Sequence, residues 1–169
     1  MSGPTLLPDT GQGIGSSGSQ KIRLDFAARP DAVRKAMILL RDLLKMQNIA
    51  ICDVETTELV LAEVLNNIVE HACANLPDGR ISVRIRNCTS ALRCQVHDNG
   101  CRMPGGNPPD GRHPDPGGPV AELPEGGFGW MLIRGLTQDL LYRRKGDGNT
   151  LGFVIPLSPD CPACKNRLV

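Results

Sequence analysis

The stretch Glu63-Val-Leu-Asn-Asn67-Ile-Val-Glu-His71 lies inside residues 53–74, a segment whose apolar residues recur at helical spacing. This periodicity predicts an amphipathic helix that packs on a core, and Asp53 is suited to cap its first turn. On the opposite side, Glu63, Asn67 and His71 follow one another every four residues, so the three side chains share one helix face. The apolar stripe consists of Leu61, Leu65, Ile68 and Ala72.

The polar stripe has two interpretations. A polar face is often simply the solvated side of a helix. However, Asn66-Asn67 is unfavourable in the middle of a helix, and an exposed face more naturally carries pairs of Lys, Arg and Glu. Oxygen ligands suit Mg2+, which prefers a few protein oxygens together with phosphates and waters. The amide of Asn67 is therefore a candidate metal ligand. The carboxylate of Glu63 is a candidate base for an attacking hydroxyl or water.

Alternating or helical patterns surround this segment on both sides. Pro30 stands at a favourable first-turn position of one further predicted helix, residues 30–47, and a third is predicted over residues 130–139. The resulting order, β-α-α-β-β-loop-α-β-β, predicts an α/β (α+β) two-layer sandwich: a mixed, mostly antiparallel sheet with three helices on one face. Five segments alternate between apolar and polar residues and are predicted strands with one buried face: residues 21–26, 81–86, 92–97, 141–144 and 151–155.

Two short motifs flank a Pro- and Gly-rich loop, residues 103–125. Before the loop, the carboxylate of Asp98 at a strand end is a possible acceptor for the exocyclic amine of adenine, and Gly100 lets the backbone pass close to a flat base. After it, Gly127-Phe-Gly129-Trp130 leads into a helix, where free backbone N–H groups form an anion site. Taken alone, the first motif is also an ordinary turn, and the second is also a hinge.

The domain organisation follows from composition. Residues 1–20 are rich in Gly, Ser and Pro and are predicted to be a disordered leader; residues 21–157 form one domain, and residues 158–169 a tail. A long loop inside a compact domain, here 103–125, is typical of a lid, although an insertion without a role fits equally well. The tail pair Cys161 and Cys164 supplies only two of the four ligands of a structural zinc site, which favours two plain thiols.

Charge and hydropathy exclude several protein classes. The chain of 169 residues has 19 Lys and Arg against 18 Asp and Glu, a formal charge of +1, which argues against a protein that binds nucleic acid or a membrane surface. It contains no run of the roughly 18 to 20 apolar residues that cross a bilayer. Seven cysteines, five of them scattered through predicted helices, strands and turns, suit a reducing compartment, so the expected location is the cytoplasm.

The order of these motifs resembles that of the GHKL (Bergerat-fold) ATPases and, within them, the stand-alone anti-sigma-factor serine kinases of the RsbW and SpoIIAB kind. The resemblance covers roughly residues 20–157. Residues 63–71 are similar to the family's N box, residues 98–100 to its adenine-binding box, and residues 127–129 to its phosphate-binding box. Arg102 stands where many members have a second glycine. The resemblance implies these nucleotide-binding residues: Asn67, His71, Asp98, Gly100, Gly127, Phe128, Gly129, Trp130 and Thr150.

The resemblance also implies an activity. The chain would be a homodimeric, ATP- and Mg2+-dependent serine kinase and anti-sigma factor that phosphorylates an anti-sigma-factor antagonist (a STAS-domain protein) and holds a sigma factor. Glu63 would be the catalytic base and Asn67 the Mg2+ ligand. Arg102 or Arg112 would neutralise developing charge, or would be an ordinary surface or hinge residue. Two alternatives stay open: a non-catalytic ATP-binding switch that sequesters a partner, and an ATP hydrolase that only moves the lid.

Overall fold

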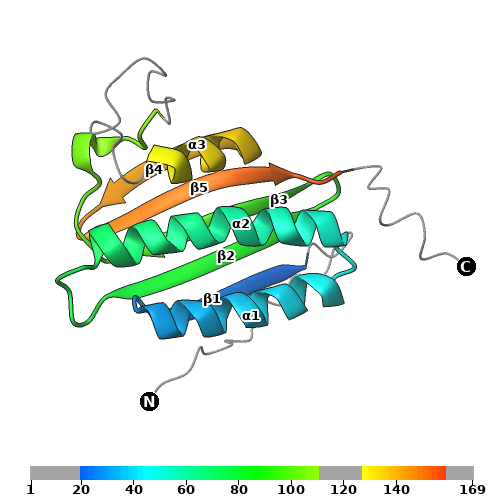
Figure 1. Cartoon of the computed structure of the whole chain (residues 1–169), viewed down its shortest axis with the longest axis horizontal. Helices are drawn as coiled ribbons and strands as arrows, with labels where there is room; N and C mark the ends of the chain where they lie inside the picture. The colour runs from blue at the N-terminus through cyan, green and yellow to red at the C-terminus, as the bar shows by residue number, and fades with distance from the viewer. Residues whose placement is uncertain (1–19, 111–126, 159–169) are drawn as a thin grey trace, which may run out of the picture.

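Five strands form one antiparallel sheet in the order β1-β2-β3-β5-β4 (Figure 1). The computed structural model describes residues 20–110 and 127–158. All four pairings among the described strands are antiparallel, so the sheet contains none of the parallel pairs that a mixed sheet would have. The strands are β1 (Lys21–Ala27), β2 (Arg80–Cys88), β3 (Ala91–Asp98), β4 (Gln138–Lys145) and β5 (Gly148–Pro156).

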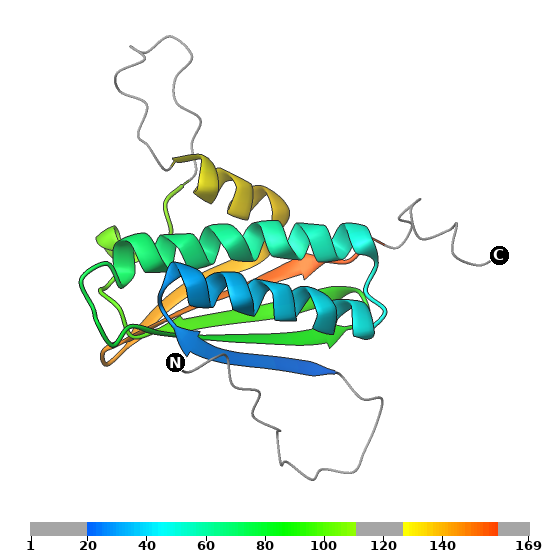
Figure 2. The same cartoon turned by 60° about the horizontal axis from the view of Figure 1, so that its bottom comes forward.

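Three helices lie on one side of this sheet, which confirms the predicted two-layer sandwich. The helices α1 (Pro30–Met46) and α2 (Ile51–Asn67) run side by side over the strands, and α3 (Gly127–Leu136) lies next to α2, towards β4 and β5 (Figures 1 and 2). A short 3-10 turn, Pro104–Gly106, follows β3. No helix in residues 20–110 or 127–158 is long and apolar enough to span a membrane.

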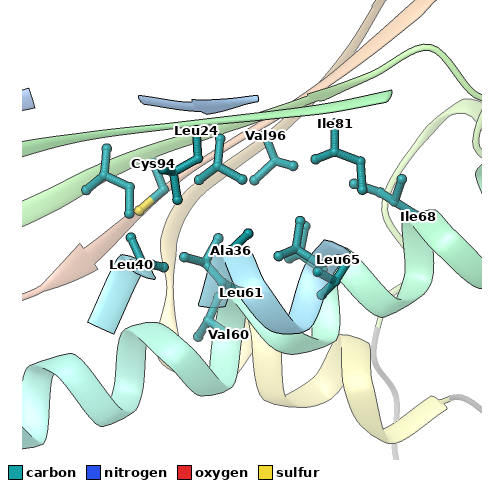
Figure 3. Packing of buried hydrophobic residues seen from close by; sticks show 14 of the residues in the cluster. Leu24, Ala36, Leu40, Val60, Leu61, Leu65, Ile68, Ile81, Cys94 and Val96 are labelled. Carbon is teal, nitrogen blue, oxygen red and sulfur yellow. The ribbon is translucent and has the colours of Figure 1, made fainter. Parts of the chain in front are cut away.

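The core is made where the apolar stripes of α1 and α2 meet the inward-facing residues of the sheet (Figure 3). Alternation along the strands places every second residue in this layer, as in β1, where Ile22, Leu24 and Phe26 are buried. Leu40 of α1 and Leu61 of α2 are at most 1% exposed. The helical spacing of the apolar residues therefore explains which helix faces the sheet covers.

The second helix departs from its predicted form at both ends. Its N-cap is Ala50, so the prediction that Asp53 caps it is wrong. Asp53 instead lies buried inside the first turn, where its carboxylate accepts a hydrogen bond from the backbone N–H of Ser158 at 3.1 Å. At the other end the α-helix does not continue to residue 74. It widens into a π-helical turn, Ile68–Ala72, closed by Cys73 N–H to Ile68 C=O at 2.8 Å.

The third helix is shifted towards the N-terminus relative to the prediction of 130–139. It begins at Gly127 and ends at Leu136. Asp139 has φ of +52°, which excludes it from a right-handed helix, and the β4–β5 register shifts between Gln138 and Leu141. The predicted leader to residue 19, lid residues 111–125 and tail from residue 159, including Cys161 and Cys164, lie outside the described residues.

Candidate functional site

A cavity of about 610 Å³ opens between the end of α2, the loop after β3, the start of α3 and the β4–β5 hairpin. Four of the predicted nucleotide-binding residues line it: Asn67, His71, Asp98 and Trp130. They come from three segments far apart in the chain. The volume lies in the range of roughly 300 to 1,000 Å³ that is usual for small-molecule sites. The three sequence motifs therefore meet around one space.

Asp98 is the buried acid of this cavity, with only 5% of its surface exposed. Its Oδ1 accepts hydrogen bonds from the backbone N–H of Gly100 at 2.8 Å and from the amide of Asn149 at 2.7 Å. No other donor in the described part of the chain reaches this carboxylate, so Oδ2 remains available to a ligand in the cavity. Burial raises the pKa of Asp98, and the bonds from Asn149 and Gly100 act against that rise by favouring the charged form.

Asn149 is the centre of the polar network behind Asp98. Besides Asp98, its amide N–H2 group donates to the carbonyls of Gly100 (3.2 Å) and Cys101 (2.9 Å). Its amide oxygen accepts bonds from the hydroxyl of Tyr142 at 2.6 Å and from Arg144 at 2.8 Å. Every polar atom of this buried side chain is thereby used, which fixes its orientation and, through it, that of the Asp98 carboxylate.

Gly100 brings the loop after β3 into contact with the π-helical turn. A Cβ at position 100 would lie 2.5 Å from the carbonyl oxygen of Ala72, a backbone atom with no freedom to move aside. Next to it, the N–H of Cys101 donates to the same carbonyl at 2.8 Å. Glycine is therefore required at position 100 by the close approach of two backbone segments.

The polar stripe of α2 faces the start of α3. Gly129 lies against Glu63: a Cβ at position 129 would be 2.5 Å from Glu63 Oε2 and 3.9 Å from Asn67 Nδ2. His71 lies on the π-helical turn and still lines the cavity. Such turns are frequent at functional sites. Glu63, Asn67 and the first turn of α3 thus share one side of the site, where the amide oxygen of Asn67 fits the preference of Mg2+ for oxygen ligands.

The first residues of the predicted lid are held at two points. At its start, the backbone N–H of Met103 donates to the hydroxyl of Tyr142 at 3.0 Å. Further along, the guanidinium of Arg134 in α3 donates to the carbonyls of Pro108 (2.9 Å) and Pro109 (2.7 Å). Arg102 is exposed and lines the cavity beside this segment. The other candidate cation, Arg112, lies outside the described residues.

Among the predicted binding residues, the side chains of Phe128 and Thr150 do not line the cavity. Thr150 points to the opposite face of the sheet, where its hydroxyl lies 3.1 Å from Nδ1 of His97. The reason is the two-residue period of a strand: the neighbouring Asn149 faces the cavity, so Thr150 cannot. Phe128 is 61% exposed in the first turn of α3. Both side chains therefore point away from the cavity, and their assignment to the nucleotide stays a prediction. Gly127 and Gly129 lie within the first turn of α3, whereas the sequence pattern had them precede the helix.

Sequence reasoning missed Asn149, Tyr142 and Arg144. One signal was available for the first of these: Asn149 stands two residues before Leu151 in an alternating strand, so it shares the face of the core residues. A polar residue on that face must be hydrogen-bonded. For Tyr142 and Arg144 there was no comparable signal, because their role depends on the loop after β3, which the sequence pattern does not place.

Comparisons with known proteins agree with this fold. The serine-protein kinases RsbW of Bacillus cereus and Bacillus anthracis are each 28% identical to this chain over 122 residues, 72% of this chain and 76% of theirs. A crystal structure of the RsbU and RsbW domains of a Mycobacterium tuberculosis protein has the same fold, with a TM-score of 0.57 at 16% identity. That match covers 85% of this chain and only 34% of the other. Residues 26–155 match the family described as histidine kinase-like ATPase domain, and the chain belongs to that family.

Proposed function

We propose that this chain is an ATP-dependent protein serine kinase and anti-sigma factor, which phosphorylates an anti-sigma-factor antagonist in a cytoplasmic bacterial partner-switching system. The proposal rests mainly on how three side chains converge. Asp98 and Asn67 line one cavity, and Glu63 lies at its edge beside Gly129. The similarity to serine-protein kinases named RsbW supports the choice of a serine acceptor.

The base of ATP fits the Asp98 end of the cavity. Oδ2 of Asp98 accepts the exocyclic amine of adenine, while Oδ1 stays bonded to Gly100 and Asn149. Guanine has a carbonyl at the corresponding position and offers no donor to this oxygen. The buried carboxylate is therefore the group that selects adenine.

The phosphates extend from there towards the start of α3. Backbone N–H groups of the first turn, Gly127–Gly129, are free of intrahelical partners and favour negative charge. Asn67 would hold Mg2+, which supplies charge neutralisation for the phosphates when bound. Glu63, which lies beside Gly129, accepts the proton of the acceptor hydroxyl. Catalysis is otherwise alignment and charge stabilisation.

Phosphorylation changes the partner's affinity by electrostatics. A phosphoserine carries about −1.5 to −2 charge at neutral pH, which disfavours a complex formed around an uncharged hydroxyl. The antagonist then dissociates, and the freed kinase binds a sigma factor.

The test is to incubate the full chain with Mg2+, γ-labelled ATP and a candidate antagonist, and then to locate the label. Label on an antagonist serine supports the kinase. Absence of label, combined with tight binding of the antagonist, would instead establish a non-catalytic ATP-binding switch. Release of labelled phosphate without protein labelling would establish an ATP hydrolase.

Gly129→Ala is expected to reduce phosphotransfer by at least about ten-fold while the protein stays folded and binds ATP. The new Cβ would displace Glu63 Oε2, which is the end of a flexible side chain, so the carboxylate moves and the fold does not. Gly135→Ala in the same helix is the matched control, because nothing lies within 4 Å of a Cβ there. Both variants gain similar helix propensity, up to about 1 kcal/mol. Single-turnover rates and thermal unfolding measure the two effects; equal rates in the two variants would contradict the role of position 129.

Tyr142→Phe is expected to weaken ATP binding by about 3- to 10-fold, with the rate at saturating ATP unchanged. The change removes two hydrogen bonds, from Met103 N–H and to Asn149, each contributing roughly 0.5–1.5 kcal/mol. Tyr142 is a positioning residue, since it holds Asn149 and the start of the lid. Titration calorimetry with ATP measures the affinity. A loss of thermal stability with unchanged affinity would show that the hydroxyl has only a structural role.

A further inference from the structure

The face of the sheet that points away from the helices carries a concentration of arginines. In Figure 2 the helices α1, α2 and α3 lie on one side of the strands, and no helix of residues 20–110 or 127–158 covers the opposite side. Alternation places exposed side chains of three neighbouring strands on that side. We define the arginine patch as Arg23 of β1, Arg84 and Arg86 of β2, and Arg93 of β3.

The strand register brings these arginines directly opposite one another. Arg23 pairs with Arg84 across β1 and β2, and Arg86 pairs with Arg93 across β2 and β3. Like charges at directly opposite positions destabilise a sheet. Since the chain has a formal charge of only +1, this concentration is a property of one face and not of the whole composition.

Few acidic groups neutralise the patch. Arg23 forms an ion pair with Asp25 on the same strand, at 2.9 Å. Within the described segments, Arg84, Arg86 and Arg93 have no carboxylate within 4.0 Å. The planar guanidinium group is suited to bidentate bonds with carboxylates. Like charges at opposite positions cost the sheet stability, and three of the four guanidinium groups form no ion pair with another described residue, an arrangement typical of a binding surface.

We propose that the arginine patch is a docking surface for a protein that presents clustered Asp and Glu side chains. A single-stranded nucleic acid fits less well, because it is held by aromatic stacking as well as charge. All five aromatic residues of the chain lie elsewhere: Phe26, Phe153 and Trp130 in the core, Tyr142 at the cavity and Phe128 on α3.

A second copy of the chain fits less well too. A symmetric dimer through this face would bring arginines against arginines, because such an interface uses the same patch on both copies. The patch is also on the side of the sheet opposite α2 and the cavity. An acidic partner bound there leaves the cavity open, so this interaction is separate from phosphotransfer and its test needs no ATP.

The experiment uses the full chain and fluorescently labelled poly-L-glutamate, with fluorescence anisotropy at low ionic strength. Arg84→Glu combined with Arg86→Glu is expected to weaken binding by roughly ten-fold or more. The matched control is Arg34→Glu combined with Lys35→Glu, which makes the same charge change at exposed positions of α1. The control is expected to bind within about three-fold of the wild type.

A second variant, Arg84→Gln, separates the loss of patch charge from misfolding. Removing like-charge pairs is expected to raise the unfolding temperature of Arg84→Gln, because Arg23 no longer faces a cation. This neutral variant should also bind poly-L-glutamate more weakly than the wild type does. A more stable protein that binds less cannot be explained by misfolding.

Several results would overturn the proposal. One is that the wild type does not bind poly-L-glutamate. Another is that the patch and control variants lose affinity equally. A third is that the oligomeric mass changes in the patch variant, which would make a second copy of the chain the occupant. Tighter binding of a single-stranded oligonucleotide or of phosphatidylglycerol vesicles than of poly-L-glutamate would assign the patch to another class of partner. None of these outcomes bears on whether the chain phosphorylates a protein.

Discussion

Replacing Glu63 with alanine is expected to lower the rate of phosphotransfer about 10²- to 10⁴-fold while ATP binding is retained. The carboxylate lies beside Gly129 at the start of α3, where the phosphates are proposed to bind, and does not line the adenine end of the cavity. Its loss removes the proton acceptor for the serine hydroxyl and leaves the contacts to the base untouched.

The control for Glu63→Ala is Glu70→Ala. Glu70 is an exposed carboxylate on the π-helical turn of the same continuous segment, and it does not line the cavity. Single-turnover rates with saturating ATP separate the two residues, and titration calorimetry measures their ATP affinities. Full activity of Glu63→Ala would remove this residue as the base. Loss of ATP affinity in Glu63→Ala would mean that it acts in binding.

The second large effect is expected for Asp98→Asn. Its affinity for ATP should fall by about 100-fold, and its preference for ATP over GTP should fall as well. The substituted amide can keep the bonds from Gly100 and Asn149 through its oxygen. It then presents an N–H2 group to the amine of adenine, so a donor faces a donor. A bond to a charged acceptor contributes roughly 1.5–3 kcal/mol, and the repulsion adds to that loss.

The same variant should not be less stable than the wild type near neutral pH. Burial raises the pKa of Asp98 above its ordinary value of 3.8, so folding favours the protonated acid. The stability that this group contributes is complete at acidic pH and is lost as pH rises through the raised pKa. Asn has no charged form, so the free energy of unfolding of Asp98→Asn should increase relative to that of the wild type as pH rises from about 4 towards 7.

Thermal unfolding across that pH range measures the difference, and calorimetry with ATP and GTP measures the base preference. Unchanged discrimination between the two nucleotides would refute the assignment of Asp98 to adenine. A wild type that becomes more stable than Asp98→Asn as pH rises would show that the hydrogen bonds to the carboxylate outweigh its burial.

Local periodicity was sufficient to predict the type and order of the main helices and strands, but not where α2 and α3 begin and end. Strands such as β2 alternate because one face is buried, and α1 and α2 repeat apolar residues every three or four positions because one side meets the sheet. The same periodicity placed Glu63 and Asn67 on one face of α2, and His71 follows on the π-helical turn and lines the cavity with Asn67. The residue types alone indicated an acceptor for adenine at Asp98 and an anion site at Gly129, and the resemblance joined the two into one nucleotide site.

Other features depended on which segments meet in space. The turn at Ile68–Ala72 widens where Gly100 and Cys101 pack on the carbonyl of Ala72. Asp53 became a buried acceptor because Ser158 returns to it from 105 residues away. The sequence pattern indicates whether a segment is a helix or a strand, but it does not show which distant group each polar side chain hydrogen-bonds. Alternate residues of β5 face opposite sides of the sheet, so Asn149 and Thr150 cannot both face the cavity. Asn149 faces it and hydrogen-bonds Asp98, whereas Thr150 lies beside His97 on the other side.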